Sequence, residues 1–245
     1  MSESLLKKWH VDLEGLLGLA IPPIAIAFVS YIPTGVRRIE RALPPVTADG
    51  RTGTVAASCV FWIEAAQAVF ATVATDHGNC SVGGLTHGFK TMEEIAANAD
   101  VAALCESGWV TPEAVAAIEV VRERPKSVVY GPLRDMPVEP SVILLRINGK
   151  QQMLLHDAWP GLRFEGKPQC HIIPIAKERG EIAVSFGCML SRVRTGMSNN
   201  EVTCAIPESR VTELIERLRA ARAADRVVAA YAAEDSKRFT PHQKR

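Results

Sequence analysis

The chain has 245 residues, of which 47% are hydrophobic and 22% are charged, and its formal net charge is +1. This length and composition are typical of a globular protein with a buried core. The charge gives no reason to expect a nucleic acid or an anionic membrane as a partner.

The beginning of the chain carries acidic residues and breaks its apolar run early, so no signal peptide is expected there. The longest apolar segment, residues 16–29, contains Pro22 and Pro23 and is too short to span a bilayer. We therefore expect a cytoplasmic protein that does not cross a membrane.

The first third of the chain predicts an amphipathic helix, a buried strand, a loop rich in proline and glycine, and a second helix. These segments are residues 3–18, 24–31, 31–54 and 59–75. Two helix starts follow, because Thr91 and Glu94 form a capping-box pattern and Thr111 precedes Pro112.

The rest of the chain predicts four strands, a short helix between the second and third of them, and a long amphipathic helix at the end. The strands are expected at 127–133, 141–147, 182–186 and 201–206, the short helix at 150–159, and the long helix at 208–231.

Helices and strands thus alternate along the whole chain, which favours an α/β or α+β fold with a mixed sheet flanked by helices. We find no linker, so we expect a single domain over residues 1–245, with a flexible basic tail at 235–245.

Six cysteines are the chemically distinctive residues: Cys59, Cys80, Cys105, Cys170, Cys188 and Cys204. In a reducing compartment they are not expected to form structural disulfides, so each is core filler, a reactive thiol or a metal ligand. Thiolates suit zinc and iron–sulfur clusters, although no pair has the C-x-x-C spacing of common metal motifs.

Four of the cysteines occupy positions that suit a ligand. Cys80 and Cys188 lie on turns flanked by glycine, Cys59 begins a helix, and Cys170 lies near another helix start. Glycine lets backbone N–H groups approach sulfur, and a helix start favours a thiolate. Cys105 and Cys204 fit better as core residues.

Several segments carry a resemblance to a known family. They are LGLAIPPIAIAF (17–28), SCVFWIEAAQ (58–67), HGNCSVGG (77–84), VVYGPLRDMPVEPSVIL (128–144), QCHIIP (169–174), and SFGCMLSR (185–192) with the trailing CAIP (204–207). In these the chain resembles domain-of-unknown-function family 169, the ArCR-like proteins of archaea and bacteria. The resemblance implies that Cys59, Cys80, Cys170 and Cys188 are the family's cysteines, whereas the other two are not.

Four thiolates far apart in sequence fit a [4Fe–4S] cluster or a zinc ion with four cysteine ligands. Structural zinc usually takes closely spaced cysteine pairs, which are absent, so we favour the cluster. If only three cysteines bind, one iron stays open and can act as a Lewis acid. The choice between three and four ligands stays open.

Two residues near the cysteines are candidates for catalysis. His171 adjoins Cys170 and could handle a proton, and Arg192 could orient a substrate carboxylate or phosphate, as could Arg194. The chain has neither a nucleotide-binding glycine motif nor a common hydrolase signature.

We therefore expect an iron–sulfur enzyme, an oxidoreductase or lyase, that acts on a small molecule. The alternatives are an electron-transfer or redox-sensing module, and a structural zinc or thiol protein. A homodimer is a default expectation.

Overall fold

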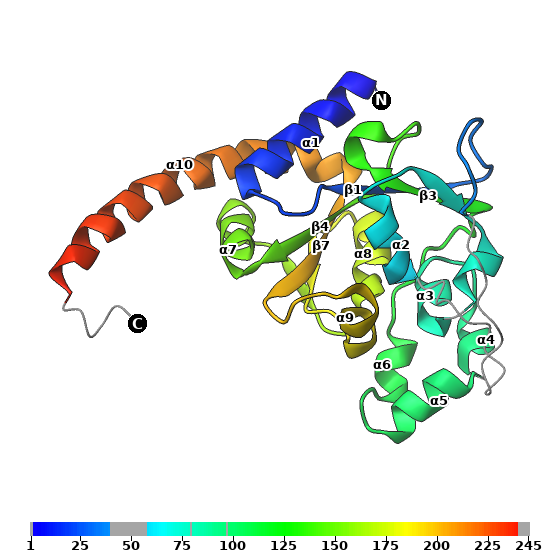
Figure 1. Ribbon diagram of the computed structural model, residues 1–245. Helices are drawn as coiled ribbons and strands as arrows, with labels where there is room; N and C mark the ends of the chain where they lie inside the picture. Colours follow the sequence, from blue (N-terminus) through cyan, green and yellow to red (C-terminus); the bar gives the residue numbers. More distant parts are fainter. Residues whose placement is uncertain (1, 40–57, 79, 97, 240–245) are drawn as a thin grey trace.

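The computed structural model describes residues 2–39, 58–78, 80–96 and 98–239, and these form a mixed α/β fold (Figure 1). Within the described residues, the strands make one seven-stranded sheet in the order β2-β3-β1-β4-β7-β6-β5. Their bounds are β1 Ile24–Val29, β2 Phe70–Thr72, β3 Ser127–Pro132, β4 Val142–Asn148, β5 Arg163–Glu165, β6 Ala183–Ser185 and β7 Glu201–Pro207. Among these seven strands of the described residues, only β5 and β6 pair in parallel. The predicted mixed sheet is confirmed.

Alternate residues of the strands point to opposite faces of the sheet, and both faces are apolar. In β4, Ile143, Leu145 and Ile147 belong to one buried cluster, whereas Val142 and Leu144 belong to another. Helices must therefore cover both sides of the sheet.

Three of the helices cover the first face: α1 Glu3–Leu17, α7 Gly149–Ala158 and α10 Val211–Asp235. All three were predicted, and α10 is the long C-terminal helix. Its first turns pack against α1 and α7, and the remainder extends away from the body (Figure 1).

Helices α2 and α8 pack on the second face, and α9 packs against α2. A smaller group of helices, α3 to α6, surrounds an apolar cluster of its own. The bounds are α2 Ser58–Ala65, α3 Ser81–Thr86, α4 Met92–Ala96, α5 Ala99–Glu106, α6 Pro112–Ala116, α8 Ile172–Arg179 and α9 Met189–Thr195, with the short 3₁₀ helix η3 Gln169–His171 before α8. The expected caps at Thr91 and Thr111 are present.

The helix predicted over residues 59–75 is wrong beyond Ala65. Residues 70–72 instead form β2, which pairs with β3 through Tyr130, Val129 and Val128. The run is apolar throughout, so its pattern did not separate a helix from a buried strand. The partner strand supplies the backbone hydrogen bonds that decide the outcome.

Other differences are smaller. Strand β5 was not predicted, and α3 and α9 follow segments that we interpreted only as turns.

Most of the predicted loop at 31–54 lies outside the described residues. In the expected tail, Ser236–Arg238 form a short 3₁₀ helix, η5, and residues 240–245 lie outside the description. No helix in the described ranges is long and apolar enough to cross a membrane.

Candidate functional site

The four cysteines singled out from the sequence each stand at the beginning of a helix. Cys59 is the second residue of α2, Cys80 is the N-cap of α3, and Cys188 is the N-cap of α9. Cys170 lies in η3, which leads directly into α8. Helix α2 contacts η3, α3 and α9, and α3 contacts η3, so the four starts are drawn together.

The four cysteine side chains line one cavity of about 360 Å³. Cys59 and Cys170 are buried, whereas Cys80 and Cys188 are half-buried. The rest of the described lining is mainly apolar, with a few polar residues: Asp100, Ser107, Trp109, Gln169, Ser191 and Arg194. Residues as distant in sequence as 59 and 188 thus meet at one place.

Backbone N–H groups from the first turns of two short helices point at sulfur. The Gly83 N–H donates to Cys80 Sγ at 3.4 Å, and the Ser191 N–H donates to Cys188 Sγ at 3.3 Å. Such N–H groups stabilise a negative charge on sulfur more than a neutral thiol.

Gly187 explains how a strand delivers Cys188 to the cavity. Strand β6 ends at Ser185, and Gly187 has a φ of +81°, a left-handed conformation that favours glycine. The chain therefore turns sharply after the strand, and Cys188 begins α9 directly behind the turn.

Burial controls the protonation of three of the thiols, those of Cys59, Cys80 and Cys170. Burial raises the pKa of Cys59 to about 12, and the neighbouring Cys80 and Cys188 add to the rise. Burial likewise raises the pKa of Cys80, although a backbone N–H and Arg194 oppose it, and it raises the pKa of Cys170 well above the usual value. Free thiols of this kind are protonated at neutral pH and are poor nucleophiles.

A single metal ion and a cluster require different spacings of the thiols. Tetrahedral zinc with bonds of about 2.3 Å needs sulfurs about 3.8 Å apart. Among the described residues, no group of three or more His, Cys, Asp or Glu side chains could hold one metal ion. A cluster places several irons and sulfides between its thiolates and so needs a cavity, which these four cysteines line.

His171 is not part of this cavity. Its Nε2 accepts a hydrogen bond from the backbone N–H of Glu119 at 2.6 Å, and its Nδ1 lies 3.7 Å from a carboxylate oxygen of Glu165. The structure therefore does not bring His171 together with the cysteines, although it adjoins Cys170 in sequence.

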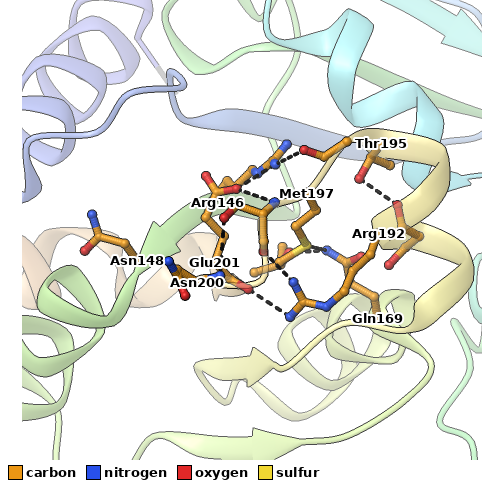
Figure 2. Close-up of polar contacts among 12 residues, drawn as sticks. Arg146, Asn148, Gln169, Arg192, Thr195, Met197, Asn200 and Glu201 are labelled. Atoms are coloured by element: carbon orange, nitrogen blue, oxygen red, sulfur yellow. Dashed lines mark hydrogen bonds and ion pairs between the residues drawn. The ribbon is translucent and has the colours of Figure 1, made fainter.

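Arg192 also lies apart from the cavity lining. Its guanidinium donates to the backbone carbonyls of Ser198, Phe186 and Glu201, as Figure 2 shows for its approach to Glu201. These bonds tie α9 to the turn after β6, to the loop before β7 and to the start of β7. Arg194, two residues further on, lines the cavity instead.

The sequence reasoning missed Asp100, Trp109 and Gln169 as lining residues. Gln169 could have been noticed because it directly precedes Cys170. Asp100 and Trp109 come from the helical group α3 to α6, and no local pattern in the sequence connects them with the cysteines.

The remaining two cysteines lie elsewhere. Cys204 is fully buried in β7 and belongs to the apolar cluster on the opposite face of the sheet. Cys105 lies in α5 and is not among the described residues that line the cavity.

These observations define a class of protein: a layered α/β fold with four cysteines around a cavity on one side of its sheet. The chain matches domain-of-unknown-function family 169, described as uncharacterised ArCR, over residues 12–217. It belongs to this family, as its sequence motifs indicated. No curated protein and no solved structure matches the chain.

Proposed function

We propose that the protein binds a [4Fe–4S] cluster through Cys59, Cys80, Cys170 and Cys188 and is a redox enzyme acting on a small molecule. One observation carries the proposal, which is that four thiols from four separate helix starts line a single cavity. Cysteines that only fill the core need not lie together. Cys204, which is such a residue, lies on the other side of the sheet.

The surroundings of the cavity suit a negatively charged centre. Four thiolates around an iron–sulfur core leave a net negative charge, and the charge and hydrogen bonds at the sulfurs tune the potential. The N–H groups of Gly83 and Ser191 point at two of the sulfurs, and Arg194 adds a positive charge. The partly apolar lining limits the access of water.

A bound cluster would supply single electrons or, with one iron open, a Lewis acid. The chain's own residues would then hold the substrate. Arg194 takes the orienting role first predicted for Arg192, because it lines the cavity. Asp100, the one carboxylate in the described lining, would exchange a proton with the substrate.

The test is metal and sulfide analysis of protein purified without oxygen, together with its absorption spectrum. We expect brown protein that contains iron and sulfide and has a broad band near ~400 nm. Changing any one of the four cysteines to alanine should remove most of the iron, because each supplies a ligand.

Cys204→Ala and Cys105→Ala are the matched controls, since both remove a thiol outside the cavity, and they should keep the iron. Colourless protein with stoichiometric zinc would contradict the proposal. Equal iron loss in the control variants would also contradict it.

A second candidate is a redox protein that passes electrons to a partner protein. Large apolar side chains are exposed around Cys188, as expected for a transient protein contact. They are Phe164, Phe186, Met189, Leu190 and Val193. In that case the reduced protein would return electrons to a protein acceptor, and small molecules would bind nowhere near the cysteines.

A further inference from the structure

Arg194 brings a positive charge into the cysteine cavity, and its guanidinium forms no hydrogen bond or ion pair with any other residue that the structure describes. The side chain is half-buried, and none of its nitrogen atoms is fully buried, so a molecule in the cavity can reach them. Arg192 of the same helix differs, because its guanidinium is bonded to three backbone carbonyls. An accessible, unpaired guanidinium in a cavity indicates a ligand with oxygen acceptors.

This guanidinium lies near two of the thiols. Burial raises the pKa of Cys59 and of Cys80, whereas the positive charge of Arg194 acts to lower both. Such an effect falls with distance. A negatively charged group held by Arg194 would therefore lie close to the cysteines.

The cavity has an inner end and an open end. Cys59 and Cys170 are buried and form the inner end, whereas Leu190 is 38% exposed and lies at the open end. Leu104 and Trp109 are half-buried parts of the lining. A molecule that reaches outward from the cysteines therefore lies against apolar side chains.

Charge decides which class of anion fits. Asp100 is the only acidic side chain of the described lining, and its Oδ1 accepts the Ser81 hydroxyl at 2.9 Å and the Val101 N–H at 3.0 Å. A dianion such as phosphate would meet one guanidinium and one carboxylate here. A single carboxylate matches the guanidinium in charge and can accept two parallel hydrogen bonds from it.

We propose that the cysteine cavity binds a small monocarboxylate with an apolar body. The carboxylate accepts hydrogen bonds from Arg194, and the body extends past Leu104, Trp109 and Leu190 toward the open end. The binding depends on the cavity alone. That this carboxylate is the substrate rests on the proposed function, which places a cluster at the inner end.

The test is calorimetry of the full-length protein, purified without oxygen, with acetate, propionate and butyrate. We expect saturable binding that becomes about fourfold tighter with each added methylene, because each one is buried against the apolar walls. Butyramide has the same shape but no charge, and it should bind at least about tenfold more weakly than butyrate.

Three variants separate the contributions. Arg194→Gln should weaken butyrate binding at least about tenfold and keep the iron. Arg226→Gln removes an exposed arginine outside the lining and should bind butyrate like the wild type. Leu190→Ser, at the open end, should keep the affinity for acetate but reduce the gain from each methylene.

The outcomes distinguish this inference from the proposed function. If iron-containing protein binds butyrate no more tightly than butyramide, or binds inorganic phosphate more tightly than butyrate, the inference is wrong and the proposed function is untouched. Loss of iron with unchanged butyrate binding in Arg194→Gln also overturns it, because Arg194 would then serve the cluster. Butyrate binding that depends on Arg194, in protein that contains no iron, supports the site and overturns the cluster.

Discussion

His77 and His87 are buried against each other, with ring centroids 5.4 Å apart. The Nδ1–H of His87 donates to the carbonyl of Gly83, a residue of the cysteine cavity, at 3.0 Å. Burial lowers the pKa of His87 to about 4 and lowers that of His77 well below the usual value. Both rings are therefore neutral in the folded protein at neutral pH.

This arrangement predicts acid sensitivity. Below pH 6.5 the unfolded chain protonates His87 but the folded protein does not, so stability falls as pH falls, until the folded pKa of about 4 is reached. Between pH 6.5 and about 5 the loss from His87 alone is about 2 kcal/mol.

Urea unfolding at several pH values checks this slope. The His87→Gln variant should show a shallower fall than the wild type, and acid effects common to both proteins cancel in the comparison. His156→Gln, at an exposed position, controls for the loss of a histidine as such. Identical slopes for the wild type and His87→Gln would contradict the assignment.

At this scale the sequence separated the four cysteines that line the cavity from the other two, but it did not identify the other residues of the lining. The local setting of each cysteine separated Cys204, in an alternating strand, from those at glycine turns and helix starts. Arg192 and Arg194 point to opposite sides of α9, because two residues along a helix turn the side chain by about 200°. Since this helix was not predicted, the sequence did not show which of the two arginines faces the cysteines. His171 likewise adjoins Cys170 but bonds to Glu119.

Among the elements, helix α9 begins with a cysteine that both lines the cavity and caps the helix. Cys188 Sγ accepts the Ser191 N–H, and the Ser191 hydroxyl accepts the backbone N–H of Cys188 at 3.3 Å, so the thiol caps the helix. Serine is among the strongest N-cap residues, whereas alanine is among the weakest.

Cys188→Ser and Cys188→Ala should therefore differ. The serine variant keeps the cap and loses the iron, while the alanine variant loses both and is less stable by about 1 kcal/mol. Urea unfolding of the metal-free proteins measures the cap, and iron analysis measures the ligand. Full iron in the serine variant would show that Cys188 has only the capping role.

The elements that were mispredicted share a physical cause. Strands β2 and β5 have three residues each. The hydrogen bonds of β2 come from β3, and those of β5 come from β6. A three-residue segment carries too little periodicity to be recognised, so its state depends on distant partners. The long helices α1 and α10 needed no such partner to be predicted.

Viewed as a whole molecule, the body of the protein ends before the chain does. The buried residues of α10 are Val211, Leu214, Ile215 and Leu218, and the family match ends at residue 217. Beyond these, Val227 and Tyr231 are 71% and 68% exposed. The distal part of α10 thus adds little to the core.

Ending the chain after Arg226 should change the free energy of unfolding by less than about 1 kcal/mol, because the removed residues bury little apolar surface. Leu214→Ala, at a fully buried position of the same helix, should cost about 2–5 kcal/mol. Urea unfolding compares the two. A large loss on truncation, with a change in mass in solution, would show that a second copy covers the distal helix.

The layered α/β architecture could be predicted because helical and strand patterns alternate along the chain. The strand order could not, since antiparallel pairing such as β1 with β3 joins segments about 100 residues apart. Similarly, the sequence indicated which cysteines lie together but not which distant residues complete their cavity.

Strand β7 comes last in the chain but lies between β4 and β6. It joins the half of the sheet that adjoins α2 to the half that adjoins α8. During synthesis, Cys59 and Cys80 are made 111 and 90 residues before Cys170, so the four cysteines can meet only late in synthesis. Under the proposed function, a cluster with all four ligands can therefore form only when most of the chain has been synthesised.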